Sequence, residues 1–558
     1  MKLLKIEINS EFSSLKPGFK LYFRSPFKDF NNDEWKQFHP FCFAGLNGSG
    51  KSNVLEALAN IFFHLECCAN VNHPQNFINQ FSPSECKPNA YKLEYYIKPQ
   101  SEKGECTIES MVLVNVVKEV NKIPEMTWKP YPFDQESPRK IDLVSDRRAS
   151  IPAGGKNYLP DLIIGYSSGE NETLSIPFLK SRLLQFDEYE EAIRKGYEFE
   201  LKKSKSDNIF PYEKPESSLI YIDYEMSQAV LLANYLFQDK EMVLKPLESL
   251  LNITDIKRFR MNLNIGHELN KQPILKQYHS TIEKFRKCST ASFQNGSRLW
   301  FDFLVNNDTR KAFQKNFNND IFELFQAFQV LYTLNYREAD YETKSDVYES
   351  RGYYTQGKVS ISGPSNRVFY FLDYYINKRD AETGKIKELL LKQLSDGEQQ
   401  FLHSLGICLM LKNKSALLLL DEPETHFNPD WRSKFISMLG KSLEGAESNN
   451  MMRDVLITSH SPFIISDCLP DNVIVFKKGK QPEKPSFNTF GASIGVITSK
   501  IFNNNQTIGD FSNDEIQKFE RFFEEQNYDE ALQILNSRIG DSVEKLLFIN
   551  KMKNKYKL

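Results

Sequence analysis

At 558 residues, the chain is long enough for two to four structural units, because single domains rarely grow beyond about 300 residues. Its 40% hydrophobic and 26% charged residues are typical of a globular protein and exclude a disordered or collagen-like one. The net charge of −2 excludes a global basic field, and no stretch resembles a signal peptide or a membrane span, so we expect a cytoplasmic protein without membrane contact.

The first predicted unit is a strand, a glycine-rich turn and a helix. Residues 41–44 are apolar, and apolar residues recur with helical spacing from Asn53 onward. Between them, residues 45–52 (the P-loop) fit G-x-x-x-x-G-K-[ST], in which backbone N–H groups wrap phosphates. Lys51 is expected to reach the β and γ phosphates of ATP, and the Ser52 hydroxyl to bind Mg²⁺. The predicted nucleotide-binding residues here are Gly45, Asn47, Gly48, Ser49, Gly50, Lys51, Ser52 and Asn53.

After this first lobe, which we place at residues 1–178, the pattern changes. Residues 179–345 show mixed helical spacing, charge clusters such as Lys202–Lys205 and no sustained heptads. This pattern predicts a mainly helical insertion rather than a long coiled-coil arm, although residues 219–222 are apolar enough to form a strand.

A second α/β lobe is predicted at residues 346–500. Residues 416–420 are apolar at every position, as in a parallel strand covered on both faces, and two further strands are expected at 455–458 and 473–476. The first strand ends in Asp421 and Glu422, at the edge where ligands of open α/β sheets gather. We expect Asp421 to hold Mg²⁺ through water and Glu422 to be the catalytic residue that orients or deprotonates the attacking water. Residues 501–558 are predicted to form a small helical appendage.

Residues 394–400, Leu-Ser-Asp-Gly-Glu-Gln-Gln, resemble the LSGGQ signature of ABC ATPases. In that family the signature lies at a helix N-terminus and caps the γ-phosphate bound by the other subunit. The resemblance therefore implies that Ser395 and Gly397 contribute to nucleotide binding in trans, and it makes Glu398 a further nucleotide-binding candidate. Taken alone, the segment also fits a simple helix cap. Its place shortly before the acidic pair favours the signature.

Two further motifs resemble parts of the same family. Residues 458–462, Thr-Ser-His-Ser-Pro, resemble the switch that carries a histidine, which implies a catalytic role for His460 at the γ-phosphate. His426 lies where the family's D-loop crosses the dimer interface. The family's Q-loop glutamine should follow the first helix, where both Gln75 and Gln80 are available.

Together these motifs resemble the ABC/SMC-like ATPases, in particular their AAA_21 or RecF-like branch. The resemblance implies an α/β fold, namely an ABC-type P-loop ATPase head that binds ATP and Mg²⁺. It also implies a homodimer of heads or a higher oligomer.

Residues 163–175 and 489–494 further resemble the restriction-associated PtuA-type ATPases of Septu and retron-linked antiphage systems. That resemblance implies a PtuB-like HNH nuclease as partner and, in retron-linked systems, a reverse transcriptase with its DNA.

Three alternatives remain. An OLD-like nuclease joins a similar head to a Toprim domain with a D-x-D cluster, but only about 100 residues follow His460 and they contain no D-x-D. A transporter ATPase is disfavoured by the long interval between the P-loop and the signature. A RecF/SMC-like DNA-repair ATPase stays open. The basic segments 257–260, 284–287 and 551–557 could contact nucleic acid, although such runs are usually solvated faces.

Overall fold

The computed structural model describes the chain except for residues 27–35, 72, 103, 146–152, 169–173, 189–217, 239–243, 265–272, 337–338, 350–366, 412–413, 444–450, 506–507, 526–527 and 557–558. The Lys202–Lys205 cluster, residues 169–173 of the segment 163–175, and residue 557 lie outside the described residues.

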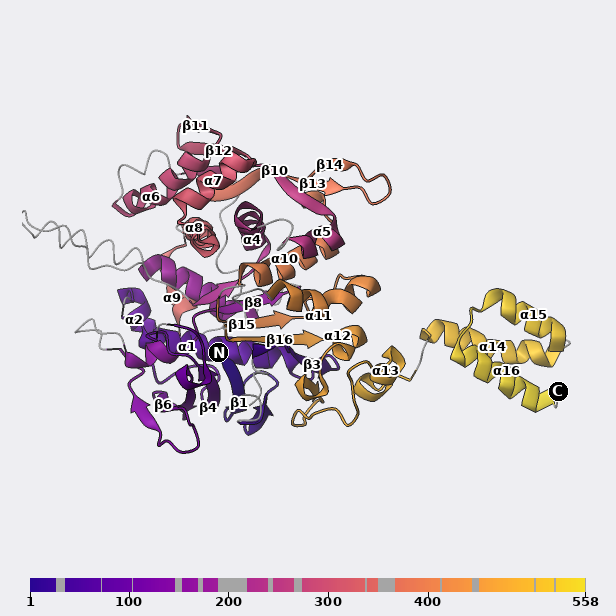
Figure 1. Ribbon diagram of the computed structural model, residues 1–558. Helices are drawn as coiled ribbons and strands as arrows, with labels where there is room; N and C mark the ends of the chain where they lie inside the picture. Colours follow the sequence, from indigo (N-terminus) through magenta and orange to yellow (C-terminus); the bar gives the residue numbers. More distant parts are fainter. Residues whose placement is uncertain are drawn as a thin grey trace, which may run out of the picture.

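A six-stranded parallel sheet forms the centre of the head (Figure 1), in the order β17-β3-β16-β15-β8-β9. Its strands are β3 (Phe41–Gly45), β8 (Ile163–Ser167), β9 (Leu219–Tyr221), β15 (Ala416–Asp421), β16 (Arg453–Ser459) and β17 (Val473–Phe476). The sheet joins segments from both predicted lobes, because β3 pairs in parallel with β16 and β8 pairs in parallel with β15.

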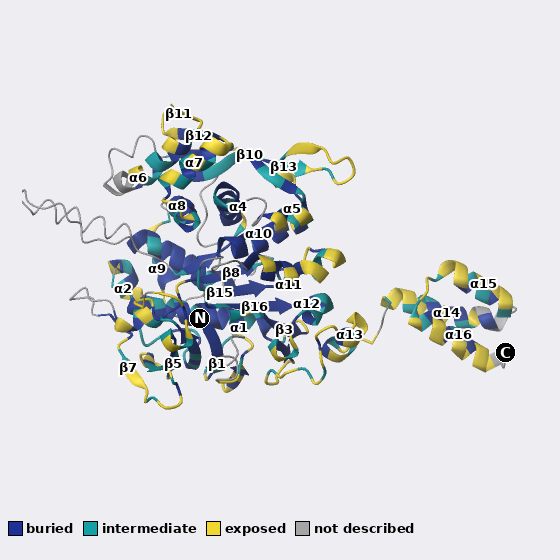
Figure 2. Ribbon diagram, in the orientation of Figure 1, coloured by how far each residue is buried: buried dark blue, intermediate teal, exposed yellow. Residues whose placement is uncertain are grey.

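Helices cover both faces of this sheet, which explains why β15 is apolar at every position. Leu417 and Leu419 point to the core beneath α1 (Lys51–Ala69), whereas Leu418 and Leu420 point to the core beneath α10 (Asp396–Met410). The central strands are accordingly the most completely buried part of the molecule in Figure 2. The α/β fold predicted for the head is confirmed. Other helices that line the α10 side include α4 (Tyr224–Phe237), α11 (Pro429–Leu443), α12 (Pro462–Ser466) and α13 (Ile494–Phe502).

A second, antiparallel sheet packs against the α1 side of the head. Its strands are β1 (Lys2–Ile8), β2 (Phe19–Tyr22), β4 (Tyr91–Ile97), β5 (Val112–Lys118), β6 (Glu125–Pro130) and β7 (Arg139–Ile141), in the order β2-β1-β4-β5-β6-β7. Residues 174–188 are helical and share the core of α1. The short helix α2 (Gln75–Gln80) follows α1.

The predicted insertion is largely helical but also contains most of a sheet. Its helices are α4, α5 (Lys245–Leu251), α6 (Pro273–Cys288), α7 (Asn307–Asn316), α8 (Ile321–Thr333) and α9 (Tyr341–Tyr348). The insertion contributes three strands, β10 (Ile253–Asn264), β11 (Ala291–Asn295) and β12 (Arg298–Leu304). They form one sheet with β13 (Phe369–Arg379) and β14 (Ile386–Leu390), in the order β11-β12-β10-β13-β14. The predicted boundary at residue 345 therefore divides one sheet. The segment 219–222 does supply a strand, but β9 belongs to the central sheet.

The predicted appendage is a three-helix bundle of α14 (Asp510–Glu525), α15 (Tyr528–Arg538) and α16 (Val543–Tyr556). It has a core of its own, made of residues such as Phe519, Leu535 and Phe548. In Figure 1 it lies apart from the head, beyond α13 and on the side towards which β15 and β16 run.

Candidate nucleotide site

The P-loop joins β3 to α1 and is shaped by its glycines. Gly45, Gly48 and Gly50 all have a positive φ, a conformation that side chains disfavour. A Cβ on Gly45 would lie 2.3 Å from the carbonyl oxygen of Phe476, so this position has no room for a side chain. Gly48 faces open space, and Asn47 and Leu46 are exposed beside it. The loop thus presents its backbone to the solvent at the start of α1.

Lys51 is held inside this loop. Its Nζ donates hydrogen bonds to the carbonyl oxygens of Gly45 and Leu46, at 3.0 and 3.2 Å, and lies 3.0 Å from His460 Nε2. Burial lowers the pKa of this amine, while the nearby carboxylates of Glu422 and Asp421 act in the opposite direction. A cation held in this way can bind phosphate oxygens as soon as they replace the carbonyl groups.

The acidic pair lies next to the P-loop at the end of β15. Ser52 Oγ donates a hydrogen bond of 2.7 Å to Asp421 Oδ1, and Thr458 Oγ1 donates one of 2.6 Å to the same oxygen. Hydroxyl and carboxylate oxygens are the ligands that Mg²⁺ prefers, so the residues present fit that ion. The buried Ser49 hydroxyl has no hydrogen-bond partner among the described residues, which also fits a ligand in the loop.

Glu422 turns away from Asp421 because its backbone leaves the strand. Its φ of 47° lies in the left-handed region, which is costly for a residue with a side chain. The Glu422 N–H donates to the hydroxyl of Thr458 at 3.0 Å and to its carbonyl oxygen at 3.2 Å, and these bonds hold the turn. The two adjacent acids can therefore have separate partners.

His460 connects Lys51 to Glu422. Its Nε2 lies 3.0 Å from Lys51 Nζ and 3.0 Å from Glu422 Oε1. A neutral imidazole can accept from the lysine or donate to the carboxylate with this nitrogen, but it cannot do both. The hydrogen bond from His460 lowers the pKa of Glu422. The arrangement is thus sensitive to any ligand that takes Lys51 from His460.

The signature segment forms the start of α10, on another part of the head. Ser395 caps the helix and forms a capping box with Glu398, which also pairs with Lys378. Gly397 packs closely, because a Cβ there would lie 2.7 Å from the carbonyl oxygen of His426. The His426 side chain is exposed. Among the described contacts of Ser395, Gly397 and Glu398, none reaches the P-loop.

The remaining sequence candidates lie elsewhere or serve locally. Asn53 accepts a hydrogen bond from Ser14 and donates one to Glu56. Gln75 bonds Asn79, and Gln80 bonds Ser345. Both glutamines follow α1, whose 19 residues extend about 28 Å from the P-loop, so the structure brings neither to the candidate site.

For two residues of the candidate site, the sequence predicted no role. Thr458 lies directly opposite Asp421 in the pairing of β16 with β15. Glu424 is buried and accepts a hydrogen bond from Ser459, and Ser459 Oγ accepts one from the Ser461 N–H. Burial raises the pKa of Glu424 to about 7. The register of β15 and β16 would have revealed Thr458, but it is not readable from one sequence.

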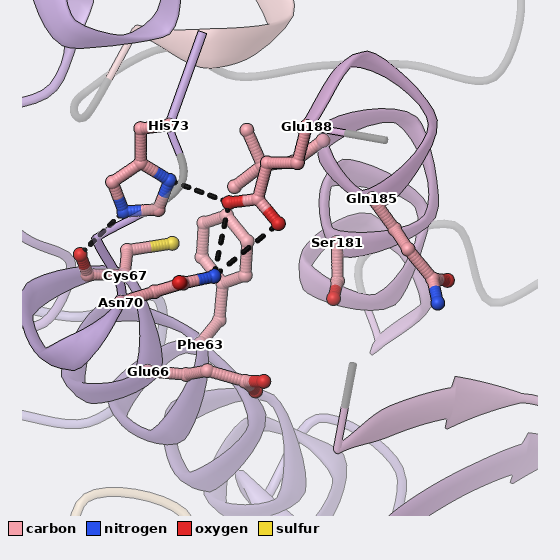
Figure 3. A pocket seen from close by; sticks show the side chains of 9 residues that line it. Phe63, Glu66, Cys67, Asn70, His73, Ser181, Gln185 and Glu188 are labelled. Atoms are coloured by element: carbon pink, nitrogen blue, oxygen red, sulfur yellow. Dashed lines mark hydrogen bonds and ion pairs between the residues drawn. The ribbon is translucent and has the colours of Figure 1, made fainter. Parts of the chain in front are cut away.

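Hollows elsewhere in the head differ from this site. Figure 3 shows one at the far end of α1, where His73 Nδ1 lies 2.6 Å from Glu188 Oε1 and Asn70 donates to the same carboxylate. Its volume of about 20 Å³ suits a single water molecule. A larger hollow of about 460 Å³, lined by residues such as Lys98 and Asp161, lies before the first residues of β15 and β16. Neither hollow is lined by the P-loop.

Comparison with known proteins finds one matching domain family and one partial relative. Residues 267–466 match the family model described as "AAA domain, putative AbiEii toxin, Type IV TA system"; this range includes the signature segment, the acidic pair and His460, but not the P-loop. Over 121 residues the chain is 26% identical to protein ea59 of Escherichia phage lambda, a match that covers 21% of this chain and only 22% of that protein.

A solved structure of the SMC head bound to the C-winged helix domain of ScpA covers 88% of this chain and 98% of its own, with 11% identity and a TM-score of 0.30. No helix in the described part of the chain is long and apolar enough to span a bilayer.

Proposed function

We propose that the chain binds and hydrolyses ATP at the site formed by the P-loop, Asp421, Glu422 and His460. The observation that carries this proposal is the meeting of Ser52 with Asp421, and of Lys51 and Glu422 with His460, although these residues come from opposite ends of the sequence. The match of residues 267–466 to an AAA domain model supports it.

Each side chain has one part in the proposed reaction. Lys51 binds the β and γ phosphates, and Ser52 and Asp421 hold Mg²⁺, directly and through water. The ion, when bound, neutralises phosphate charge during phosphoryl transfer. Glu422 orients the attacking water and accepts its proton. Once His460 has parted from Lys51, the His460 side chain donates a hydrogen bond to the γ-phosphate.

The signature segment completes the site from a second copy in this proposal. Ser395 and Gly397 stand at the N-terminus of α10, where backbone N–H groups favour a phosphate. Because their described contacts do not reach the chain's own P-loop, we assign them to the γ-phosphate bound by a partner head. ATP then lies between two heads and stabilises their dimer.

At the level of the cell, we assign the chain to an antiphage defence complex in which the ATPase scaffolds or regulates a PtuB-like HNH nuclease, beside a reverse transcriptase and its DNA where a retron is attached. The resemblance of residues 163–175 and 489–494 supports this assignment, as does the toxin named in the matched family's description. The chain alone should then not cleave nucleic acid. Cleavage by the purified chain that survives Glu422→Gln would favour an OLD-like nuclease instead.

The ATP site is tested by calorimetric titration of wild type and Lys51→Ala. The variant should lose nearly all affinity, because no other cation reaches the loop carbonyls in the described contacts. Lys118→Ala is the matched control, since Lys118 is also buried and its Nζ also donates to backbone carbonyls, those of Ser84 and Asn89. It should bind ATP like the wild type. Unchanged affinity of Lys51→Ala would refute the assignment.

A further inference from the structure

The contact between His460 and Phe502 lies at the border between the nucleotide site and the C-terminal bundle. The two rings have centroids 6.1 Å apart and planes tilted by 33°. Phe502 is the last residue of α13, and α14 begins shortly afterwards at Asp510. His460 thus contacts Lys51, Glu422 and the end of the helix that leads to the bundle.

The chain between Phe502 and the bundle is tied to α13 where it leaves the helix. Asn503 ends α13 in a left-handed conformation, with a φ of 53°. The N–H groups of Asn503 and Asn504 both donate to the carbonyl oxygen of Thr498, and the hydroxyl of Ser499 bonds the side chain of Asn505. A shift of the last turn of α13 would therefore carry residues 503–505 with it.

The rest of α13 is anchored, which confines such a shift to its end. Ile497 and Ile501 are buried in the core of the head, whereas Phe502 is only partly buried against it. On the other side, Ile508 packs against the core of the bundle. The end of α13 is thus the connection between two separately packed cores.

From these contacts we infer that Phe502 couples the position of His460 to the C-terminal bundle, so that nucleotide binding changes the dynamics of α14. The inference rests on the proposed function. When phosphate takes Lys51, His460 loses that partner, its ring turns, and the Phe502 ring that packs on it must move. Phe502 is a positioning residue in this scheme, since it acts only through His460.

Amide hydrogen exchange of residues 508–525 tests the coupling, with and without a non-hydrolysable ATP analogue. In the wild type, the analogue should change the exchange rates of α14 by about threefold or more. Phe502→Ala should bind the analogue with near wild-type affinity by calorimetry, yet lose this change. Val496→Ala is the matched control, because Val496 is an apolar residue of α13 that is 40% exposed, and it should keep the change.

A double-mutant cycle distinguishes coupling from a general loosening of α13. If Phe502 acts through His460, then His460→Ala alone should also abolish the change in α14, and adding Phe502→Ala should have no further effect. His460→Ala carries the test by itself if Phe502→Ala fails to fold. A change in α14 that persists in either variant, or wild type that binds the analogue without any change, would overturn the coupling. Failure of the wild type to bind would instead overturn the proposed function.

Discussion

Glu422 is the residue at which ATP binding and hydrolysis should separate. Glu422→Gln keeps the shape of the side chain but removes its basicity, so ATP should bind normally while turnover falls by about 100-fold or more. Steady-state phosphate release and calorimetric titration of the same preparation measure the two properties. Glu388→Gln, in strand β14, is a control that should behave like wild type. Wild-type turnover in Glu422→Gln would place the catalytic base elsewhere.

Glu424 should make the stability of the head depend on pH. Its pKa is raised by burial to about 7 in the folded chain, from an ordinary value of 4.5, and the charged groups facing it include Glu422, Arg432 and Lys51. Between these two pKa values the folded state binds more protons than the unfolded state, so the free energy of unfolding falls as pH rises, by about 3 kcal/mol in total.

Glu424→Gln should remove this dependence, because the amide cannot ionise but can still accept from Ser459. Urea denaturation at pH 5 and pH 8 measures it. The free energy of unfolding of the variant, minus that of the wild type, should be larger at pH 8 than at pH 5. An equal difference between variant and wild type at both pH values would show that Glu424 does not titrate in this range.

The residues of the candidate site differ in how far the sequence could predict them. Lys51, Ser52 and Asp421 lie in motifs whose spacing is itself the signal, and the structure brings them together. Thr458 reaches the site only through the register of two strands that are separated by a helix in the sequence. Gln75 and Gln80 failed as candidates for the nucleotide site because the length of α1, not their residue type, decides where they lie.

Among the elements, the P-loop depends most on single glycines. Gly45→Ala should lower the free energy of unfolding by about 2 kcal/mol or more, because the new Cβ would clash with the Phe476 carbonyl in a strained conformation. Gly48→Ala is the matched control, with a positive φ of 72° but open space around it, and should cost only about 1 kcal/mol. Urea denaturation without nucleotide compares them. Equal losses would mean that the contact with β17 does not constrain the loop.

Elements with local signals were predictable, and those that depend on distant partners were not. The apolar run of β15 and the capping box of α10 are visible in the sequence, and both form. Strand β13 carries no comparable signal, because it pairs with β10, which lies about a hundred residues earlier, and β14 in turn pairs with β13. The boundary predicted at residue 345 therefore falls within this sheet, between β12 and β13.

At the scale of the whole molecule, the two halves of the proposed site lie at separate places on one chain. The P-loop and the acidic pair meet at one edge of the central sheet. The signature segment caps α10, and its described contacts do not reach the P-loop. Two heads related by a twofold axis would complete two sites at once, each with the P-loop of one chain and the signature of the other. Under the proposed function, ATP hydrolysis would then be a property of the dimer.

The most direct measurement is the ATPase activity of two inactive variants after mixing. Lys51→Ala keeps its signature and Ser395→Arg keeps its P-loop, so a mixed dimer contains one intact site. At equal amounts, activity should recover to roughly a quarter of wild type, because half of the dimers are mixed and each has one of two sites. Lys51→Ala mixed with Glu422→Gln is the control and should stay inactive, since no combination restores a site. If mixed dimers form but Lys51→Ala and Ser395→Arg recover no activity at any ratio, the shared site is contradicted.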